Sequence, residues 1–360
     1  MEKRMIAVIG AGPAGCHYAS LVNQDVTLFE EHKKIGIPVS CTGIVTDSIK
    51  RVLDIPKELI VSKINTFRIV SPSKKFIDIN LDKENTVMDR AKFDQFLLQK
   101  ALDNGAKLKI NTKFIGYKEK DGKLIIKTNK GNYEANILVG ADGPKSSVAK
   151  FSNLYGKREF LEGLQARVKY KGTPGVTEIR LGLGEFAWIV PEDENIARVG
   201  VIGRNVKNDY KTLLNDCKII EDQSGLVPLY NPKQKLRKKN IFLIGDAATQ
   251  IKATTYGGII YGLLAGKYLA ENPDTYESVF NAKLGKDLWM SLKMREAMNK
   301  MNEKQYNELI TIFNKENNKK IIAEYDRDFP TKFIVQLLMK ETKLWKLGFS
   351  VVAKNMFSKE

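Results

Sequence analysis

Three glycines near the start of the chain have the spacing of a diphosphate-binding loop. Gly10, Gly12 and Gly15 form a G-x-G-x-x-G sequence that follows an apolar run over residues 5–9. Such a run is typical of a strand buried in a parallel sheet, and the glycines allow a tight turn, close approach of a pyrophosphate and packing of the next helix. Glu30, after the second predicted strand, can accept hydrogen bonds from a ribose hydroxyl. We therefore expect a dinucleotide site that also includes Pro13, Ala14 and Glu31; a glycine turn without a ligand is the alternative.

Two aspartates follow later strands of the same buried type. Asp142 and Gly143 come after the apolar residues 137–140, and Gly245 and Asp246 end a further run of this kind. The carboxyl ends of parallel strands meet at one edge of a sheet, so both carboxylates can reach ligand hydroxyls there. Each aspartate could instead cap a following helix.

These three sequence strings, in this order and at this spacing, resemble the FAD-binding pattern of the p-hydroxybenzoate hydroxylase superfamily. The resemblance implies FAD as the cofactor, with Asp246 at the ribityl chain. It also implies that Arg90 lies near the flavin nucleotide. A surface ion pair with Asp94, four residues further on, is the alternative role for Arg90.

A glycine pair opens the apolar helix that is predicted after Asp246. Gly257, Gly258 and Ile259 stand at its start, where backbone N–H groups can face the pyrimidine edge of a flavin. Such donors would favour the reduced, anionic flavin. A glycine-rich packing contact is the alternative.

Within that superfamily the chain resembles the geranylgeranyl reductases, which saturate isolated double bonds of prenyl chains in archaeal lipids, chlorophyll precursors or related isoprenoids. Residues 30–43 are similar to the family segment that brings a cysteine–glycine turn over the flavin, here Cys41, Thr42 and Gly43. The resemblance covers residues 5–270 and implies an oxidoreductase that acts on CH–CH groups.

A further string resembles the family's lipid-domain motif P-x-x-Y-x-W-x-F-P. Trp188 matches the motif, whereas Leu183, Phe186 and Val190 stand where it has proline, tyrosine and phenylalanine. Phe186, Trp188 and Val190 alternate along a predicted strand and could line an apolar slot for a prenyl chain. An aromatic stripe that simply belongs to the core is the alternative.

Reduction of an unactivated alkene requires a hydride and a proton in a dry pocket, because no carbonyl is present to polarise. His17 and His32 lie in the adenosine half of the predicted fold, and no histidine follows residue 32. Cys41 is then the candidate proton donor, with Tyr256 and an ordered water as weaker candidates. A small buried hydrophobe is the alternative role for Cys41, and we find no ligand set for a catalytic metal.

Composition narrows the classes of function. The chain has 360 residues and a formal net charge of +17, which favours anionic partners. Its three cysteines are too few for a disulfide framework or an iron–sulfur site, which fits a reducing cytoplasm. No apolar run is long enough to cross a bilayer, and the glycine loop explains the first apolar run better than a secretion signal does. We expect a prenylated, anionic lipid as substrate, an external electron donor such as reduced ferredoxin or NAD(P)H, and no nucleic acid.

These motifs require an α/β fold with two sheet domains. Buried strands of the parallel type alternate with helices around the motifs, whereas polar–apolar alternation in the middle of the chain predicts an antiparallel sheet. Asp121 and Gly122 predict a hairpin turn. The expected parts are a Rossmann-like FAD-binding domain (1–62, 84–155 and 238–275), an antiparallel substrate domain (63–83 and 156–237) and a helical C-terminal extension (276–360).

The last thirty residues predict a basic amphipathic helix. At 100° per residue, five lysines gather on about a third of the helical wheel, opposite apolar side chains. They are Lys332, Lys340, Lys343, Lys346 and Lys354. Such a helix could rest on the inner face of an anionic cell membrane; packing against the protein itself is the alternative.

We therefore interpret the chain as an FAD-dependent reductase of carbon–carbon double bonds in the prenyl chains of membrane lipids. An FAD-dependent aromatic-ring monooxygenase is the first alternative, because it shares the fold but consumes oxygen. A flavoprotein electron carrier without its own substrate is the second.

Overall fold

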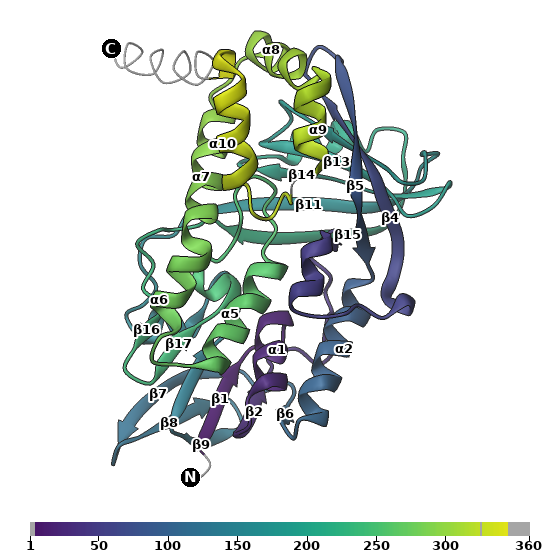
Figure 1. Ribbon diagram of the computed structural model, residues 1–360. Coiled ribbons are helices and arrows are strands. Elements are labelled where there is room, and N and C mark those ends of the chain that lie inside the picture. The colour runs from purple at the N-terminus through teal and green to yellow at the C-terminus, as the bar shows by residue number, and fades with distance from the viewer. Residues whose placement is uncertain (1–3, 325, 345–360) are drawn as a thin grey trace.

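The computed structural model describes residues 4–324 and 326–344, which form three β-sheets and a C-terminal group of helices (Figure 1). The predicted fold class is confirmed: a sheet of the parallel type, a larger mainly antiparallel sheet and a helical extension follow from one chain. The division into domains at the stated boundaries stays a prediction.

The parallel-type sheet has six strands in the order β16-β17-β10-β1-β2-β6, and only β16 is antiparallel. The strands are β1 (Met5–Ile9), β2 (Asp25–Phe29), β6 (Lys107–Lys109), β10 (Ile137–Gly140), β16 (Arg237–Lys238) and β17 (Ile241–Leu243). Helix α1 (Pro13–Leu21) packs between α2 (Arg90–Asp103) and α5 (Ile259–Glu271). This covering layer explains why the central strands are apolar throughout instead of alternating.

A three-stranded antiparallel sheet contacts the first sheet through its last strand and β1. It consists of β7 (Phe114–Lys120), β8 (Lys123–Thr128) and β9 (Gly131–Ala135), followed after β10 by the short helix α3 (Ser147–Phe151). The hairpin predicted at Asp121 and Gly122 joins β7 to β8 and is confirmed. The Tyr133 ring packs edge-on against Phe29, with 4.9 Å between centroids.

The third sheet has eight strands in the order β15-β11-β14-β13-β12-β4-β5-β3. All pairs are antiparallel except β12 with β4. The strands are β3 (Ile44–Val45), β4 (Ile60–Val70), β5 (Phe76–Met88), β11 (Phe160–Lys169), β12 (Val176–Arg180), β13 (Phe186–Pro191), β14 (Ile196–Gly203) and β15 (Lys218–Pro228), with helix α4 (Lys207–Leu213) before β15. Strands β4 and β5 together span 60–88 and are longer than the predicted 63–83 segment. The end of β5 reaches the segment that carries Cys41, where the Met88 N–H donates to the Gly43 carbonyl oxygen over 2.9 Å.

The C-terminal helices join the two large sheets (Figure 1). They are α6 (Tyr276–Phe280), α7 (Lys286–Met298), α8 (Glu303–Phe313), α9 (Glu316–Glu324) and α10 (Thr331–Lys340). Helices α8 and α9 contact β5, and α10 contacts α7 and α9. No helix among the described residues combines the length and apolar character needed to cross a membrane.

The predicted basic amphipathic helix is shorter than expected within the described part of the chain. Helix α10 ends at Lys340, and the Glu341 carboxylate accepts hydrogen bonds from Lys315 Nζ over 2.7 Å, which explains how an acidic residue is accommodated beside the apolar face. Leu337 is fully buried, so this face packs against the protein over 331–340. Lys346 and Lys354 lie outside the described residues.

Candidate functional site

The glycine loop lies between β1 and α1, as predicted. Gly10 has a φ of +100°, and a Cβ atom there would lie 2.3 Å from the carbonyl oxygen of Ala141. A Cβ atom on Gly15 would lie 2.2 Å from the carbonyl oxygen of Gly10. At Gly12, by contrast, a Cβ atom would meet nothing within 4 Å. Two of the glycines therefore permit close backbone packing, whereas Gly12 faces open space.

That open space is a cavity of about 690 Å³ at the carboxyl edge of the parallel-type sheet. It is lined by loop residues and by polar side chains of both signs, including Gly10, Gly12, Glu30, Glu31, Asp142, Gly143, Lys145 and Lys150. Pro13 and Ala14 are the first two residues of α1, and the N-terminus of this helix faces the glycine loop. Free N–H groups and lysines are the donors that a diphosphate requires.

Glu30 stands at the end of β2 with part of its acceptor capacity in use. Its Oε2 accepts the Ala11 N–H over 3.0 Å, and its Oε1 lies 2.6 Å from His32 Nδ1. Oε1 also accepts the His32 backbone N–H over 2.9 Å, so three of the carboxylate's roughly four lone-pair positions are in use and one remains for a ribose hydroxyl. The neighbouring Glu31 is paired at 3.3 Å with Lys113, on the cavity rim.

Asp142 behaves as a helix cap, which was the alternative interpretation from sequence. Its carboxylate accepts from Ser146 Oγ over 2.6 Å and from the backbone N–H groups of Ser147 and Val148 over 2.6 and 3.0 Å. Burial raises the pKa of Asp142, while these hydrogen bonds oppose the rise. Gly143, with a φ of +73°, leaves open space beside it. A ligand role for Asp142 would require it to share oxygens that already cap α3.

Asp246 differs from Asp142, because no described residue hydrogen-bonds its carboxylate. It follows Gly245, which has a φ of +63°, and its Oδ1 lies 3.1 Å from the position of a Cβ atom on Gly258. Burial raises the pKa of Asp246 to about 6, opposed by the charges of Arg90 and Arg158. A half-buried acceptor that no described residue hydrogen-bonds is the group expected where ligand hydroxyls bind. Gly257, Gly258 and Ile259 follow at the N-terminus of α5, as predicted.

Replacement of Asp246 by Asn should change how the stability of the FAD-free protein depends on pH. The pKa of Asp246 is raised in the folded state, so its protonated carboxyl adds to the free energy of unfolding below pH 4. This contribution is lost as the pH rises through about 6. The variant should therefore gain about 1–3 kcal/mol relative to wild type between pH 4 and pH 7. Urea unfolding at both pH values measures this; parallel pH profiles of the two proteins would contradict it.

Arg90 forms the ion pair with Asp94 that sequence analysis gave as the alternative, but the pair is buried and not on the surface. Arg90 Nη2 lies 3.0 Å from Asp94 Oδ1, and the side chains are 14% and 10% exposed. The Arg90 side chain also reaches within 3.2 Å of a Cβ position on Gly43. Arg90 therefore packs against the segment that carries Cys41 and supports it.

A second cavity, of about 350 Å³ and mainly apolar, begins at that segment. Its lining includes Cys41, Thr42 and Gly43, and also Phe186, Trp188, Tyr256 and Gly257. Ser40 borders both cavities, so the two meet there. Val190 is an exception to the prediction: it is fully buried and packs with Ile64, Phe67 and Val87, so it belongs to the core and does not line the cavity.

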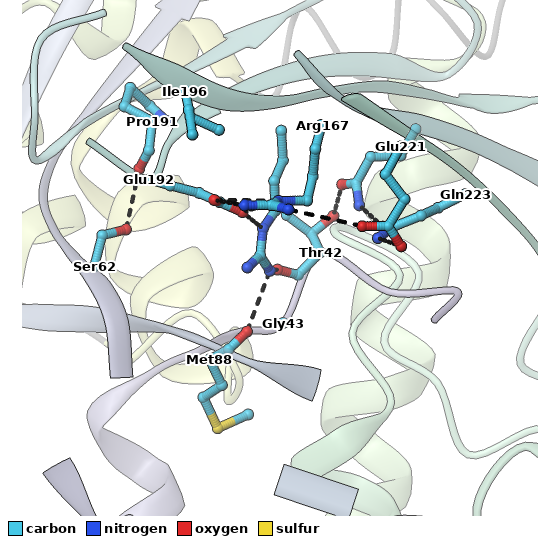
Figure 2. A network of polar contacts seen from close by, with 12 residues as sticks. Thr42, Gly43, Ser62, Met88, Arg167, Pro191, Glu192, Ile196, Glu221 and Gln223 are labelled. Carbon is cyan, nitrogen blue, oxygen red and sulfur yellow. Dashed lines mark hydrogen bonds and ion pairs between the residues drawn. The ribbon is translucent and has the colours of Figure 1, made fainter. Parts of the chain in front are cut away.

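Polar side chains of the antiparallel sheet hold the segment around Thr42 (Figure 2). Gln165 Oε1 accepts from Thr42 Oγ1 over 2.7 Å and from Trp188 Nε1 over 2.8 Å. Gln165 Nε2 in turn donates to Gln223 over 2.6 Å. One amide on β11 thus holds both the loop that carries Cys41 and the indole of Trp188.

An arginine on β14 fixes the same loop through its backbone. Arg198 is 7% exposed and donates to the carbonyl oxygens of Thr42 and Met88. Its Nε lies 2.7 Å from Glu192, which Arg167 also contacts over 2.7 Å (Figure 2). The charge of Arg198 is balanced by Glu192, so a buried cation can serve as a rigid support.

Tyr256, which also lines the cavity, is held in place by neighbouring side chains. Its ring stacks on Phe186 at 6.0 Å, and its hydroxyl donates to Glu185. Burial raises the pKa of Tyr256 well above its usual value, and the hydrogen bond to Glu185 raises it further. Arg295 of α7 donates to the carbonyl oxygens of Ala253 and Thr254 and so fixes the preceding loop. A tyrosine whose proton is bound to a carboxylate is a poor donor to substrate, which leaves Cys41 as the stronger candidate.

Sequence analysis did not identify Gln165, Glu185, Arg198 or Arg295. Gln165 and Arg295 line the cavity from a strand and a helix distant in sequence and belong to no motif, whereas Glu185 and Arg198 stand at or just after the lipid-domain string, at positions that its pattern does not specify. A signal existed only for Arg198, since a charged residue within the apolar strand β14 requires a buried partner.

The residues present fit an extended dinucleotide with a flavin end. The glycine loop leaves space for a diphosphate, Glu30 retains one acceptor position, and Asp246 is a half-buried carboxylate that no described residue hydrogen-bonds. The two cavities meet at Ser40, so one ligand could reach from the loop to Cys41.

No family model matches the chain. Comparison with curated proteins finds digeranylgeranylglycerophospholipid reductase 3 of Methanosphaera stadtmanae, 29% identical over 394 aligned positions that cover 95% of this chain and 97% of the relative. The digeranylgeranylglycerophospholipid reductase of Methanocaldococcus jannaschii is 29% identical over 350 positions, covering 84% and 89%. The resemblance predicted from the motifs is thereby confirmed.

Solved structures confirm the fold. A geranylgeranyl bacteriochlorophyll reductase-like protein from Thermoplasma acidophilum superimposes with a TM-score of 0.79 at 21% identity, covering 96% of this chain and all of that one. The flavin-dependent halogenase CmlS superimposes with a TM-score of 0.63 at 14% identity, covering the whole of this chain and 71% of that one.

Proposed function

We propose that the protein is an FAD-dependent reductase that saturates carbon–carbon double bonds of geranylgeranyl or related prenyl chains in membrane lipids. One observation carries the proposal: an apolar cavity bordered by Cys41 and Trp188 meets the glycine-loop cavity at Ser40. A dinucleotide bound along the first cavity would present its far end to a chain bound in the second. The names of the two curated relatives support the same substrate class.

The chain's own residues would bind FAD, orient the prenyl chain and protonate its double bond. Gly12, Glu30 and Asp246 would hold FAD, which supplies a hydride when it is bound and reduced. Cys41 would hold the proton at Sγ, toward which the Gly43 N–H points over 3.3 Å. Phe186 and Trp188 would exclude water from the double bond, as a proton transfer to carbon requires.

Anaerobic addition of substrate to the reduced holoenzyme tests the proposal. A reductase should reoxidise when a geranylgeranyl lipid is added, and the lipid should gain mass in steps of two hydrogens. The absorbance of oxidised flavin and mass spectrometry of the lipid measure the two effects. A product that forms only with oxygen would favour the monooxygenase, and no reaction with any lipid would favour the electron carrier.

The electron donor and the place of action are further parts of the proposal. Only one G-x-G-x-x-G loop is present in the sequence, so reducing equivalents would come from a separate protein or from NAD(P)H that binds transiently. The net charge of +17 would favour peripheral contact with an anionic membrane surface from the cytoplasmic side.

A further inference from the structure

The apolar cavity contains more positive than negative charge. Lys252, Arg295, Arg327 and Asp328 line it. Lys252 Nζ forms a buried ion pair with Asp328, with side-chain exposures of 3% and 9%. Arg295 donates to three backbone carbonyl groups and lies 3.9 Å from Glu185. Two of the three cations therefore have a carboxylate partner, and Arg327 remains.

Arg327 is held in position by contacts that do not use its guanidinium N–H groups, as far as the described residues show. Its guanidinium stacks on the ring of Phe67, 4.0 Å from the centroid, and its carbonyl oxygen accepts from Lys252 Nζ over 3.1 Å. Within residues 4–324 and 326–344, no acceptor hydrogen-bonds the guanidinium. A guanidinium stacked on a ring keeps its planar edge of N–H groups free for an oxyanion.

The two carboxylates beside Arg327 are bound elsewhere. Asp326 accepts from Ser48 Oγ and lies 3.7 Å from Arg51, while Asp328 is bound by Lys252 and Thr46. Burial lowers the pKa of Arg327, and the neighbouring carboxylates only oppose this effect. A half-buried guanidinium to which no described carboxylate is hydrogen-bonded is costly, so the site favours a ligand that brings an anion.

We propose that Arg327 binds a phosphate group attached to the prenyl substrate. The remaining wall supports this assignment, because the same cavity continues along apolar side chains of β4, β5, α8 and α9, where a chain could lie. Those side chains are Ile69, Ile79, Leu81, Ile310, Phe313 and Ile322. The inference rests on the proposed function for the prenyl chain and extends it to the charge at its end. Arg327 would thus contribute substrate specificity from outside the flavin motifs.

Geranylgeranyl diphosphate and geranylgeraniol test this assignment, since they share the chain and differ in the phosphate. In the holoenzyme, Arg327→Gln should raise KM for the diphosphate by about 10- to 100-fold, the range for a lost charged hydrogen bond. KM for the alcohol should change by less than about twofold. Arg327→Lys keeps the charge but loses the planar pair of N–H donors, so its KM for the diphosphate should lie between those of the wild type and Arg327→Gln.

Arg68→Gln is the matched control. Arg68 also stacks on a phenylalanine, Phe76, at 4.6 Å, but it is ion-paired with Asp78 and does not line the cavity. Its replacement should leave the preference for diphosphate over alcohol unchanged. Equal changes for both substrates in Arg327→Gln and Arg327→Lys would overturn the assignment, even if wild-type protein reduces both and the proposed function holds.

Equilibrium dialysis separates failure of the inference from failure of the proposed function. If geranylgeranyl diphosphate binds the oxidised holoenzyme with dependence on Arg327 but is never reduced, the inference stands and the proposed function fails. Inorganic diphosphate should compete only weakly, because it lacks the chain. If it binds as tightly as the prenyl ester, and through Arg327, the site takes free phosphates and the assignment to a lipid is overturned.

Discussion

Replacement of Cys41 by Ala should lower the rate of prenyl-chain reduction by about 10²- to 10⁴-fold, the range expected when a positioned proton donor is lost. The thiol borders the cavity, and the Gly43 N–H points at its sulfur over 3.3 Å. Gln165 and Arg198 fix the adjoining residue Thr42, so the loop should persist without the sulfur. Stopped-flow reoxidation of the reduced flavin by a prenyl lipid measures the rate.

Two controls separate proton donation from packing. Cys217, a half-buried thiol packed beside Ala166 and Val168, lies away from both cavities, and Cys217→Ala should reduce lipid at the wild-type rate. Cys41→Ser keeps the size and a donor, and it should recover part of the lost rate with a changed pH profile. Flavin content should match wild type in all three variants. Unchanged turnover in Cys41→Ala would exclude Cys41 as the donor.

The parts of the fold that depend on local sequence were predictable. The glycine loop, the strands around it and the hairpin at Asp121 and Gly122 each follow from a few neighbouring residues. Strand β15 was not predicted, because it is an edge strand with most residues exposed, so no polar–apolar alternation marks it. Its pairing with β11 arises from backbone hydrogen bonds, which have no signature in side-chain pattern.

The roles of individual site residues depended on tertiary contacts that no spacing encodes. Asp142 and Asp246 stand in similar sequence contexts and both lie near a helix start, yet among the described residues only the Asp142 carboxylate accepts hydrogen bonds from one. Val190 and Trp188 share one face of β13, but Ile64 and Phe67 of β4, which lies beyond β12 in the sheet, pack with Val190. Alternation predicted the shared face correctly and could not predict where along it the cavity ends.

Long-range contacts also explain why sequence analysis did not identify the residues that hold the Cys41 segment in place. Thr42 lies 123 positions from Gln165 and 156 from Arg198, so the contacts exist only once β11 and β14 have paired. The C-terminal helices add Arg295 and Arg327 from still further along the chain. A motif search finds the residues that touch a shared cofactor, whereas the residues that shape a particular substrate cavity come from these long-range contacts.

Replacement of Gly12 by Val should abolish FAD uptake while leaving the folded protein nearly as stable as wild type. Gly12 has a φ of −78°, which any residue can adopt, and a Cβ atom there meets no protein atom within 4 Å. The added side chain would instead occupy the space in front of the α1 N-terminus. Loss of about 3 kcal/mol or more of binding free energy, at least 100-fold in affinity, is expected. Fluorescence titration with FAD measures it.

Two other glycines, one in the loop and one remote from it, provide controls for the Gly12→Val variant. Gly15→Ala should unfold or strongly destabilise the FAD-free protein, because its Cβ atom would lie 2.2 Å from a backbone oxygen. Gly285→Ala, remote from the loop and with only Asn281 and Tyr230 atoms near 3.8 Å or beyond, should affect neither property. Thermal unfolding of the FAD-free forms separates the three variants. If Gly12→Val still bound FAD with wild-type affinity, the diphosphate would not cross this loop, and the cavity in front of it would belong to another ligand.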